Sequence, residues 1–168
     1  MQDECMTQTV PQSVTSAAMR RTLAGFATGL SVVAAELDGR VVGMPANSLA
    51  SVSLDPPLVS LAFARTSTTW PALRTAPRWG ISVLAEEQAA LLDVLRRPAG
   101  ARFQGVGLNI DDGAVYIRDA LATIAVAPRT VVEAGDHDLV LLEVTHLHRD
   151  ETQQPLVFFN STTHLLSH

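Results

Sequence analysis

The amino-acid sequence predicts a mainly β fold, a largely antiparallel barrel that carries peripheral helices. About seven strand-like apolar segments stand against two or three helical ones, and this ratio favours a β architecture. Several of the segments are joined by short turns typical of hairpins, such as Asp38-Gly39. A doubly wound parallel sheet would need strands and helices in strict alternation, which this sequence does not have.

The N-terminal part predicts a helix followed by a hairpin. The segment SVTSAAMRRTLAGFATG has Ser or Thr at a capping position and apolar residues at near-helical spacing, and Gly29 ends it. The run LSVVAAEL (30–37) predicts a strand, and Asp38-Gly39 turns the chain back into RVVGM. One amphipathic helix is therefore expected to lead into antiparallel sheet.

Two further strands and two helices are predicted in the middle of the chain. PPLVSLAFA and WGISVLA are the strands, and the short helix TTWPALRTAP between them ends at Pro77. AEEQAALLDVLRRP (85–98) predicts the second substantial helix, with two glutamates in its first turn, as the helix dipole favours. Trp70 and Trp79 are expected in the core or in an interface.

The C-terminal half predicts mostly strands. Residues 114–127 and 129–148 are rich in Val, Ile and Leu, and they are interrupted by Pro128 and by Gly135-Asp136. The segment PLVFFN (155–160) predicts a last strand.

Composition limits the classes of function. Hydrophobic residues make up 47% of the 168 residues and charged residues only 17%, which suggests apolar surface buried in a homo-oligomer. The net charge of −5 gives no basic surface for nucleic acid or for an anionic membrane, so neither is expected as a partner.

Cysteine content and chain organisation suggest a cytoplasmic protein. Cys5 is the single cysteine, so neither a disulfide nor a cysteine metal site is expected. The sequence has no signal peptide pattern and no apolar run long enough to span a membrane. No repeat or linker divides it, so we expect one domain over residues 14–168, preceded by a loose arm at 1–13.

Two neighbouring segments carry side chains that suggest a ligand. In RTSTTWPAL, Thr68 or Thr69 can cap a helix, and Arg65 with the N–H groups and hydroxyls around it suits a phosphate. In GMPANSLASVS, Asn47 and Ser48 stand among small side chains and suit the imide edge of a flat heteroaromatic ring. Each segment also has an interpretation without a ligand: a capped surface helix, and an ordinary loop with a Ser/Thr turn.

Taken in order with other blocks, these segments resemble the flavin reductase-like family. The blocks are FATGLSVVAA, GRVVGMPANSLASVSLDPPLVSLAFARTSTTWPAL, ISVLAEEQ, RFQGV, GDHDLVLLEV and PLVFF, and the resemblance runs from about Met19 to Phe159. It implies a split β-barrel homodimer that binds FMN or FAD and takes hydride from NADH or NADPH. It also implies a flavin-dependent monooxygenase as the partner that uses the reduced flavin.

The resemblance implies site residues by position. Against the flavin ring it places Met44, Pro45, Ala46, Asn47, Ser48, Leu49 and Ser51. Along the ribityl chain and phosphate it places Phe63, Ala64, Arg65, Ser67, Thr68 and Thr69. His137, in the GDH block, becomes the expected catalytic residue in contact with the nicotinamide, although a lone histidine between two aspartates is by itself more typical of a turn. The cofactors carry the hydride chemistry, so the protein contributes mainly geometry.

The sequence departs from the family in three places. Pro45 stands where many relatives carry Thr, Leu142 stands where many carry Gly, and the tail FFNSTTHLL differs from the usual ends. A second hypothesis is therefore a flavin-binding relative that turns over no nucleotide.

A third hypothesis is a metal oxygenase. His146 and His148 alternate onto one strand face, and paired imidazoles with an upstream carboxylate such as Asp136 suit iron or manganese. The spacing of His137 and His146 argues against it, because an unbroken strand would turn them to opposite faces. We therefore expect no metal site.

Overall fold

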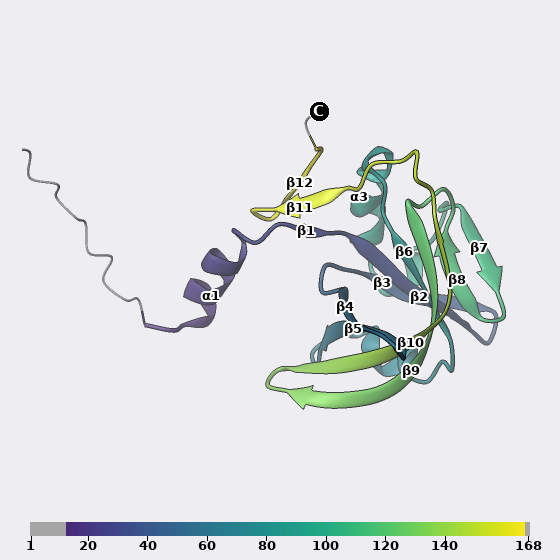
Figure 1. Ribbon diagram of the computed structural model, residues 1–168, viewed down its shortest axis with the longest axis horizontal. Coiled ribbons are helices and arrows are strands. Elements are labelled where there is room, and N and C mark those ends of the chain that lie inside the picture. The colour runs from purple at the N-terminus through teal and green to yellow at the C-terminus, as the bar shows by residue number, and fades with distance from the viewer. Residues whose placement is uncertain (1–12, 167–168) are drawn as a thin grey trace, which may run out of the picture.

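The computed structural model describes residues 13–166 and shows a mainly β protein with short helices at its edges (Figure 1). Nearly all of the predicted arm, with Cys5, lies outside the described residues. The mainly β prediction with peripheral helices is confirmed. The elements in chain order are α1 (Ser16–Leu23), β1 (Thr28–Gly29), β2 (Ser31–Leu37), β3 (Arg40–Ala46), β4 (Ala50–Leu54), β5 (Pro57–Ala64), α2 (Trp70–Leu73), β6 (Trp79–Val83), η1 (Glu86–Gln88), α3 (Leu91–Leu95), η2 (Ala99–Ala101), β7 (Leu108–Asp111), β8 (Ala114–Ile117), β9 (Ala122–Ala134), β10 (His137–Arg149), β11 (Val157–Phe159) and β12 (Thr162–His164).

One antiparallel sheet of nine strands dominates the fold. Its order is β4-β5-β10-β9-β6-β2-β8-β7, and β3 pairs with β2 outside this path. The first half of β10 pairs with β5. Strand β9 pairs with β10 along nearly its whole length, and the first part of β9, residues 122–126, also pairs with β6. Strands β1, β11 and β12 form a second, three-stranded sheet.

The predicted hairpin between β2 and β3 is confirmed. Asp38 and Gly39 have φ angles of 50° and 73°, so both turn residues adopt the left-handed conformation that a two-residue hairpin turn requires. In the resulting register Val33 lies opposite Met44, and Ser31 lies opposite Ala46. The turn therefore sets which residues of β3 border the site described below.

The long hairpin of β9 and β10 accommodates Pro128 inside a strand. The pairing of β9 with β6 ends at Val126, so Pro128 lies beyond it, where β9 has a partner only in β10. A proline is tolerated at such a position, because its missing N–H group costs no bond within a central ladder. A register shift next to Leu142, which faces Pro128, accompanies it.

The core lies on both faces of β2. Val33 and Ala35 pack in one cluster with Phe63, Trp70 and Trp79, whereas Val32 packs in a second cluster with residues of α3 such as Leu95. Trp70 and Trp79 are 3% and 0% exposed, so the prediction that they are core residues is confirmed. Strand β2 thus anchors β3 against a buried scaffold.

The helix predicted over residues 85–98 is broken, and that part of the prediction is wrong. The structure has η1, a turn, and then the separate helix α3. The side chain of Gln88 accepts a hydrogen bond from the Ala85 N–H group and donates one to the carbonyl oxygen of Arg118. This tertiary contact holds the first turn in a tight 3₁₀ form, which propensity and periodicity do not predict.

The C-terminal tail contains one strand more than expected. The predicted strand in PLVFFN is β11, and the chain then turns at Asn160 and Ser161, with φ angles of 54° and 64°, into β12. Two left-handed residues again build a tight hairpin turn.

Helix α1 stands away from both sheets (Figure 1). It begins after Thr15, whose Oγ1 accepts a 3.1 Å hydrogen bond from the Ala18 N–H group, so the predicted Ser/Thr cap is confirmed. No residue of the helix is buried, and Leu23 is 59% exposed. Within residues 13–166, no helix combines the length and the apolar character needed to cross a membrane.

Candidate functional site

The two predicted ligand segments meet in the structure. The hydroxyl of Ser67, after β5, lies 3.7 Å from the sulfur of Met44 on β3. The hydroxyl of Ser48 donates to the carbonyl oxygen of Ala62 at 3.2 Å and accepts from the N–H group of the same residue at 3.1 Å. The segment expected to hold a ring and the segment expected to hold a phosphate are thus neighbours.

The ring segment borders a cavity. Pro45, Ala46 and Asn47 line a hollow of about 220 Å³ together with Leu30 and Phe158. The hydroxyl of Ser31 donates to the Ala46 carbonyl oxygen at 2.9 Å and fixes the end of β3.

The remaining ring-segment residues have mixed positions. Leu49 is half-buried and packs against the core, whereas Ser51 is exposed on β4. The hydroxyl of Ser48 makes two hydrogen bonds to the main chain of Ala62, and these hold the loop between β3 and β4 to β5.

The phosphate segment divides into a buried and an accessible part. Phe63 is 1% exposed and stacks on Trp70 with ring centroids 4.4 Å apart, so its side chain belongs to the core. Ala64 is half-buried and pairs with His137 on β10. Thr68 is exposed and lines a second cavity of about 430 Å³.

The prediction that Thr68 or Thr69 caps the helix is confirmed for position only: Thr69 is the N-cap residue of α2, but its side chain makes no capping hydrogen bond. The hydroxyl of Ser67 accepts hydrogen bonds from the N–H groups of Thr69 and Trp70, both at 3.2 Å. Thr69 has helical dihedral angles, whereas a residue whose side chain caps a helix is typically extended. Its hydroxyl instead accepts a bond from Arg102. Pro71 lies in the first turn of α2, where its missing N–H group leaves no helical hydrogen bond unmade.

We predict that Ser67→Ala lowers the free energy of unfolding by about 1 kcal/mol, because two N–H groups at the start of α2 lose their acceptor. Urea denaturation of the variant and of the parent protein measures the difference. Thr66→Ala serves as the control, since Thr66 is exposed and makes no such bond to α2. Equal losses from both variants would contradict the capping role.

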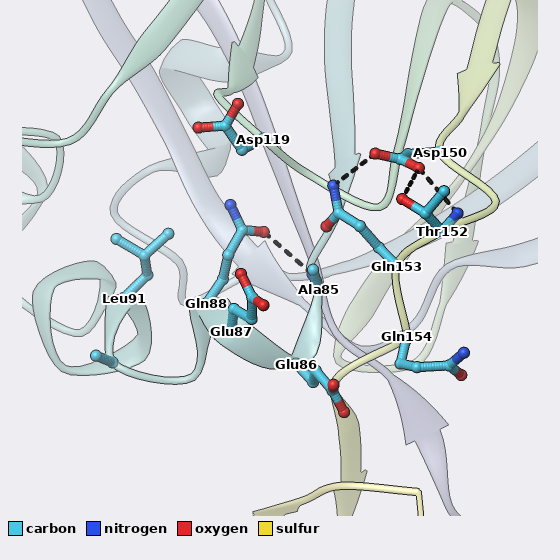
Figure 2. A pocket seen from close by; sticks show the side chains of 11 residues that line it. Ala85, Glu86, Glu87, Gln88, Leu91, Asp119, Asp150, Thr152, Gln153 and Gln154 are labelled. Carbon is cyan, nitrogen blue, oxygen red and sulfur yellow. Dashed lines mark hydrogen bonds between the residues drawn. The ribbon is translucent and has the colours of Figure 1, made fainter.

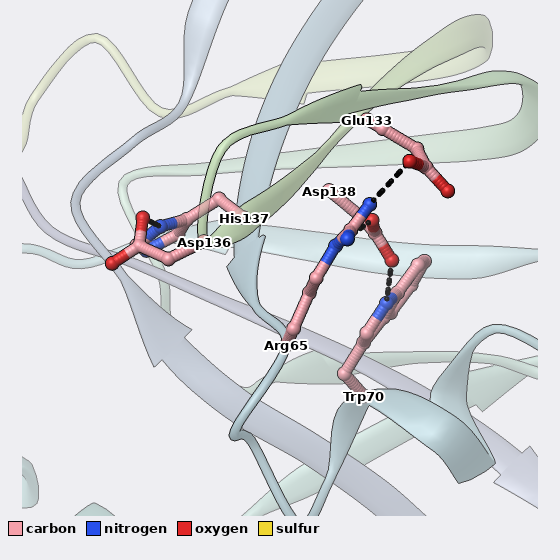
Figure 3. Close-up of polar contacts among 6 residues, drawn as sticks. All are labelled: Arg65, Trp70, Glu133, Asp136, His137 and Asp138. Carbon is pink, nitrogen blue, oxygen red and sulfur yellow. Dashed lines mark hydrogen bonds and ion pairs between the residues drawn. The ribbon is translucent and has the colours of Figure 1, made fainter.

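Arg65 lies in a charge network rather than alone (Figure 3). Its Nε donates to Asp138 at 3.0 Å, and its Nη2 lies 3.1 Å from Glu133. The Trp70 indole N–H donates to the other oxygen of Asp138 at 2.8 Å, and this bond, followed by that from Arg65, holds the pKa of Asp138 below its usual value. Two carboxylates therefore already balance the charge of Arg65.

His137 faces away from this network (Figure 3). Its Nδ1 lies 2.7 Å from a carboxylate oxygen of Asp136, and its side chain is 43% exposed. The hydrogen bond from His137 holds the pKa of Asp136 below its usual value. Because neighbouring strand residues alternate in direction, buried Asp138 points inward while His137 stays accessible beside Ala64.

Arg102 contacts both candidate segments and was not predicted from the sequence. Its Nη1 donates to the carbonyl oxygen of Gly43 at 2.6 Å and to the hydroxyl of Thr69 at 3.1 Å, so it joins the two segments. Burial lowers its pKa, and no described residue forms an ion pair with it. The block RFQGV contains it, but nothing in the spacing of that block indicates a contact with β3.

A larger cavity, of about 640 Å³, lies elsewhere and does not suit a phosphorylated ligand (Figure 2). Four carboxylates line it, those of Glu86, Glu87, Asp119 and Asp150. Hydrogen bonds from Thr152 and Gln153 lower the pKa of Asp150 to about 2, so its charge persists at neutral pH. A phosphate would be repelled there.

The metal oxygenase hypothesis gains no support from the geometry. In the described part of the chain, no three His, Cys, Asp or Glu side chains come together as ligands for a metal ion. His146 and His148 are exposed near the far end of β10.

Known proteins resemble the chain over most of its length. Residues 19–167 match the family described as "Flavin reductase like domain". The chain is 37% identical over 151 residues to "FMN reductase (NADH) SmoA" of Agrobacterium fabrum, which covers 89% of this chain and 85% of that protein. The solved structure of the "Styrene Monooxygenase Flavin Reductase (SMOB)" from Pseudomonas putida S12 has a TM-score of 0.80 and 31% identity, covering 88% of this chain and 96% of that one.

The lengths of the relatives differ. A relative from Rhizobium meliloti is 36% identical over 130 residues, and the matched part is 76% of this chain but only 42% of that protein. The family match nevertheless spans nearly all the described residues and includes both site segments. The chain therefore belongs to the flavin reductase-like family.

Proposed function

We propose that the protein is an NAD(P)H-dependent flavin reductase, which transfers hydride from NADH or NADPH to FMN or FAD and supplies reduced flavin to a partner monooxygenase. The observation that carries the proposal is the meeting of the two ligand segments at Met44 and Ser67 in a chain of this family. The relative from Agrobacterium fabrum is named for FMN and NADH, and the Pseudomonas putida structure for styrene monooxygenase.

The residues around the two segments fit a flavin. Small side chains and main-chain groups border the cavity at Pro45, Ala46 and Asn47, which suits the close approach of a flat ring. The hydroxyls and main-chain N–H groups of the other segment suit a phosphate, and Arg65, which Asp138 and Glu133 hold in place, would add its remaining N–H donors. We assign the ring edge to Met44, Pro45, Ala46, Asn47, Ser48, Leu49 and Ser51, and the ribityl phosphate to Ala64, Arg65, Ser67, Thr68, Thr69 and the main chain of Phe63.

The protein's own part in the reaction is to orient the two cofactors. A bound flavin supplies a hydride acceptor, and this chemistry needs no side-chain nucleophile. Main-chain N–H groups of the ring segment would stabilise negative charge at the ring edge. His137, accessible and oriented by Asp136, would contact the nicotinamide from the strand next to the phosphate segment.

The architecture proposed for residues 14–168 is a single split-barrel domain that forms a homodimer. The order and antiparallel pairing of the nine-stranded sheet are compatible with a strongly curved sheet around the cluster of Phe63, Trp70 and Trp79. Exposed apolar side chains on α1, such as Met19 and Leu23, favour a second subunit that covers them.

A flavin-binding protein without turnover is the alternative. The departure from the family at Leu142 does not favour this alternative. Leu142 is 0% exposed, so the difference affects packing in the core. Pro45 remains a difference at the site, since it lines the cavity and offers no hydroxyl. Binding of flavin without reduction would favour this alternative.

The test is anaerobic mixing of the purified protein with FMN or FAD and with NADH or NADPH. We expect the visible absorbance of the oxidised flavin to bleach with at least one pair, faster than without protein. Flavin binding without bleaching for any pair would favour the non-catalytic alternative. Absence of binding by either flavin would overturn the proposal.

A variant of His137 extends the same test. We expect His137→Ala to raise KM for the nucleotide by about tenfold, equivalent to about 1.4 kcal/mol of lost binding. His148→Ala is the matched control, because this exposed histidine lies on the same strand far from the site. An equal effect of both substitutions would argue against a nicotinamide contact.

A further inference from the structure

The cavity of about 220 Å³ beside the ring segment has one charged side chain in its wall. Of the described residues that line this cavity, Arg96 is the only charged one, and it lies there with Pro45, Ala46 and Asn47. Arg96 belongs to neither ligand segment, because it directly follows α3. A cation therefore borders the end of the site proposed for the flavin ring.

The packing of α3 directs Arg96 toward this cavity. Arg96 is the C-cap residue of α3, and its N–H group donates to the carbonyl oxygen of Leu92 at 3.0 Å. Side chains four residues apart lie on the same face of a helix. Leu92 is 7% exposed and packs in one cluster with Leu30 and Phe158, which line the same cavity. The buried Leu92 therefore fixes the face of α3 on which Arg96 approaches the ring segment.

The charge of Arg96 is only weakly balanced within the protein. Among residues 13–166 its ion pair is with Asp93, at 3.6 Å, and the two side chains are 62% and 87% exposed. An ion pair this exposed contributes little, because water screens both charges. Arg65, in contrast, lies 3.0 and 3.1 Å from two carboxylates. Arg96 can therefore turn toward a negative charge in the cavity at little cost.

Hydride transfer would create such a charge. Hydride carries two electrons and one proton from the reduced nicotinamide to the flavin ring, so the nicotinamide is oxidised and the ring gains one negative charge. A cation beside the ring stabilises this anion more than it stabilises the neutral oxidised ring. Leu30, Pro45 and Phe158 make part of the cavity wall apolar, and charges attract each other more strongly beside such a wall than in open water.

We propose that Arg96 contacts the flavin ring and makes the protein bind reduced flavin more tightly than a protein without this cation would. The inference rests on the proposed function, because it requires the flavin ring to lie in the cavity of 220 Å³. It extends that function by assigning to one side chain the preference between the two redox states of the flavin. Hydride uptake would then be more favourable, and the reduced flavin would stay bound longer before the partner takes it.

The test measures the affinity of the protein for both redox states of one flavin. Fluorescence titration gives the Kd of the oxidised form, for whichever of FMN and FAD the parent protein binds more tightly. The midpoint potential of the bound flavin, compared with that of the free flavin, then gives the Kd of the reduced form. Arg96→Gln removes the charge but keeps hydrogen-bond donors, whereas Arg96→Lys keeps the charge. Arg97→Gln is the matched control, because Arg97 is exposed and lines neither cavity beside the site.

We expect Arg96→Gln to weaken binding of the reduced flavin selectively. The affinity for the reduced form, relative to that for the oxidised form, should fall by about tenfold. For a two-electron couple this change lowers the midpoint potential of the bound flavin by about 30 mV. Arg96→Lys should retain most of the parent protein's preference, and Arg97→Gln should retain all of it.

Other results would overturn the inference and leave the reductase proposal intact. These are an unchanged midpoint potential in Arg96→Gln, an equal loss of affinity for both redox states, and an equal shift in Arg97→Gln. A shift in Arg96→Lys as large as that in Arg96→Gln would exclude the charge as the cause. Failure of the parent protein to bind either flavin would instead overturn the proposed function, and this inference with it. Circular dichroism checks that the variants fold, as expected for a side chain that is 62% exposed.

Discussion

Replacing Gly43 with alanine is expected to destabilise the protein by at least about 3 kcal/mol and to abolish flavin binding. A Cβ atom at this position would lie 2.5 Å from the Cβ of Ala34 and closer still to the carbonyl oxygen of Val33. Both belong to β2, which is buried on its two faces and has no room to retreat. Strand β3 would have to separate from β2, and the carbonyl that Arg102 contacts would move with it.

Thermal denaturation and flavin titration together measure this effect. Gly29→Ala is the matched control, because a Cβ at Gly29 would meet no atom within 4 Å and Gly29 lines neither of the two cavities beside the site. We expect the control to keep the melting temperature of the parent protein within a few degrees. A folded Gly43→Ala variant with normal stability would mean that β2 and β3 tolerate a wider separation than the packing indicates.

Local sequence patterns predicted the hairpins and the alternation of strands well. Asp38-Gly39 specifies its turn because few other residue pairs adopt two left-handed conformations in succession. The apolar runs of β2, β5 and β6 were recognisable because buried strands need them. Tertiary contacts determine the features that these patterns did not predict. The helix predicted over residues 85–98 is broken where Gln88 bonds to the carbonyl oxygen of Arg118, and hydrophobic periodicity cannot indicate such a contact.

The site was predictable as two segments but not as a set of contacts. Family resemblance located Met44 and Ser67 in the same site, and the structure brings them together. No sequence pattern indicated that Asp138 and Glu133 pair with Arg65, because both residues are distant from it along the chain. For the same reason the contacts of Arg102, with Gly43 on β3 and with Thr69 just before α2, became evident only in the structure.

Trp70→Phe is expected to lower the melting temperature by about 3–10 °C near neutral pH. The substitution keeps the ring that stacks on Phe63 but removes the N–H group that donates to Asp138. Asp138 is 8% exposed, so water cannot fully replace the lost donor. Arg65 would remain as its partner, and the carboxylate would be less well stabilised in the folded protein.

The pH dependence of this loss identifies its origin. The pKa of Asp138 is lowered first by the bond from Trp70 and then by that from Arg65, so this contribution to stability is present above the unfolded-state pKa, about 3.9. It disappears as the pH falls through the lower pKa of the folded protein. The difference in melting temperature between the parent protein and Trp70→Phe should therefore shrink in acid.

Trp79→Phe provides the matched comparison. The indole of Trp79 is also buried, but it donates to the neutral carbonyl oxygen of Ala76 at 3.1 Å. Its loss should destabilise the protein by an amount that hardly changes between neutral and acidic pH, because no ionisable group accepts the bond. If both variants responded to acid alike, the Asp138 carboxylate would not be the group that Trp70 stabilises, and the network that anchors Arg65 beside the site would need another explanation.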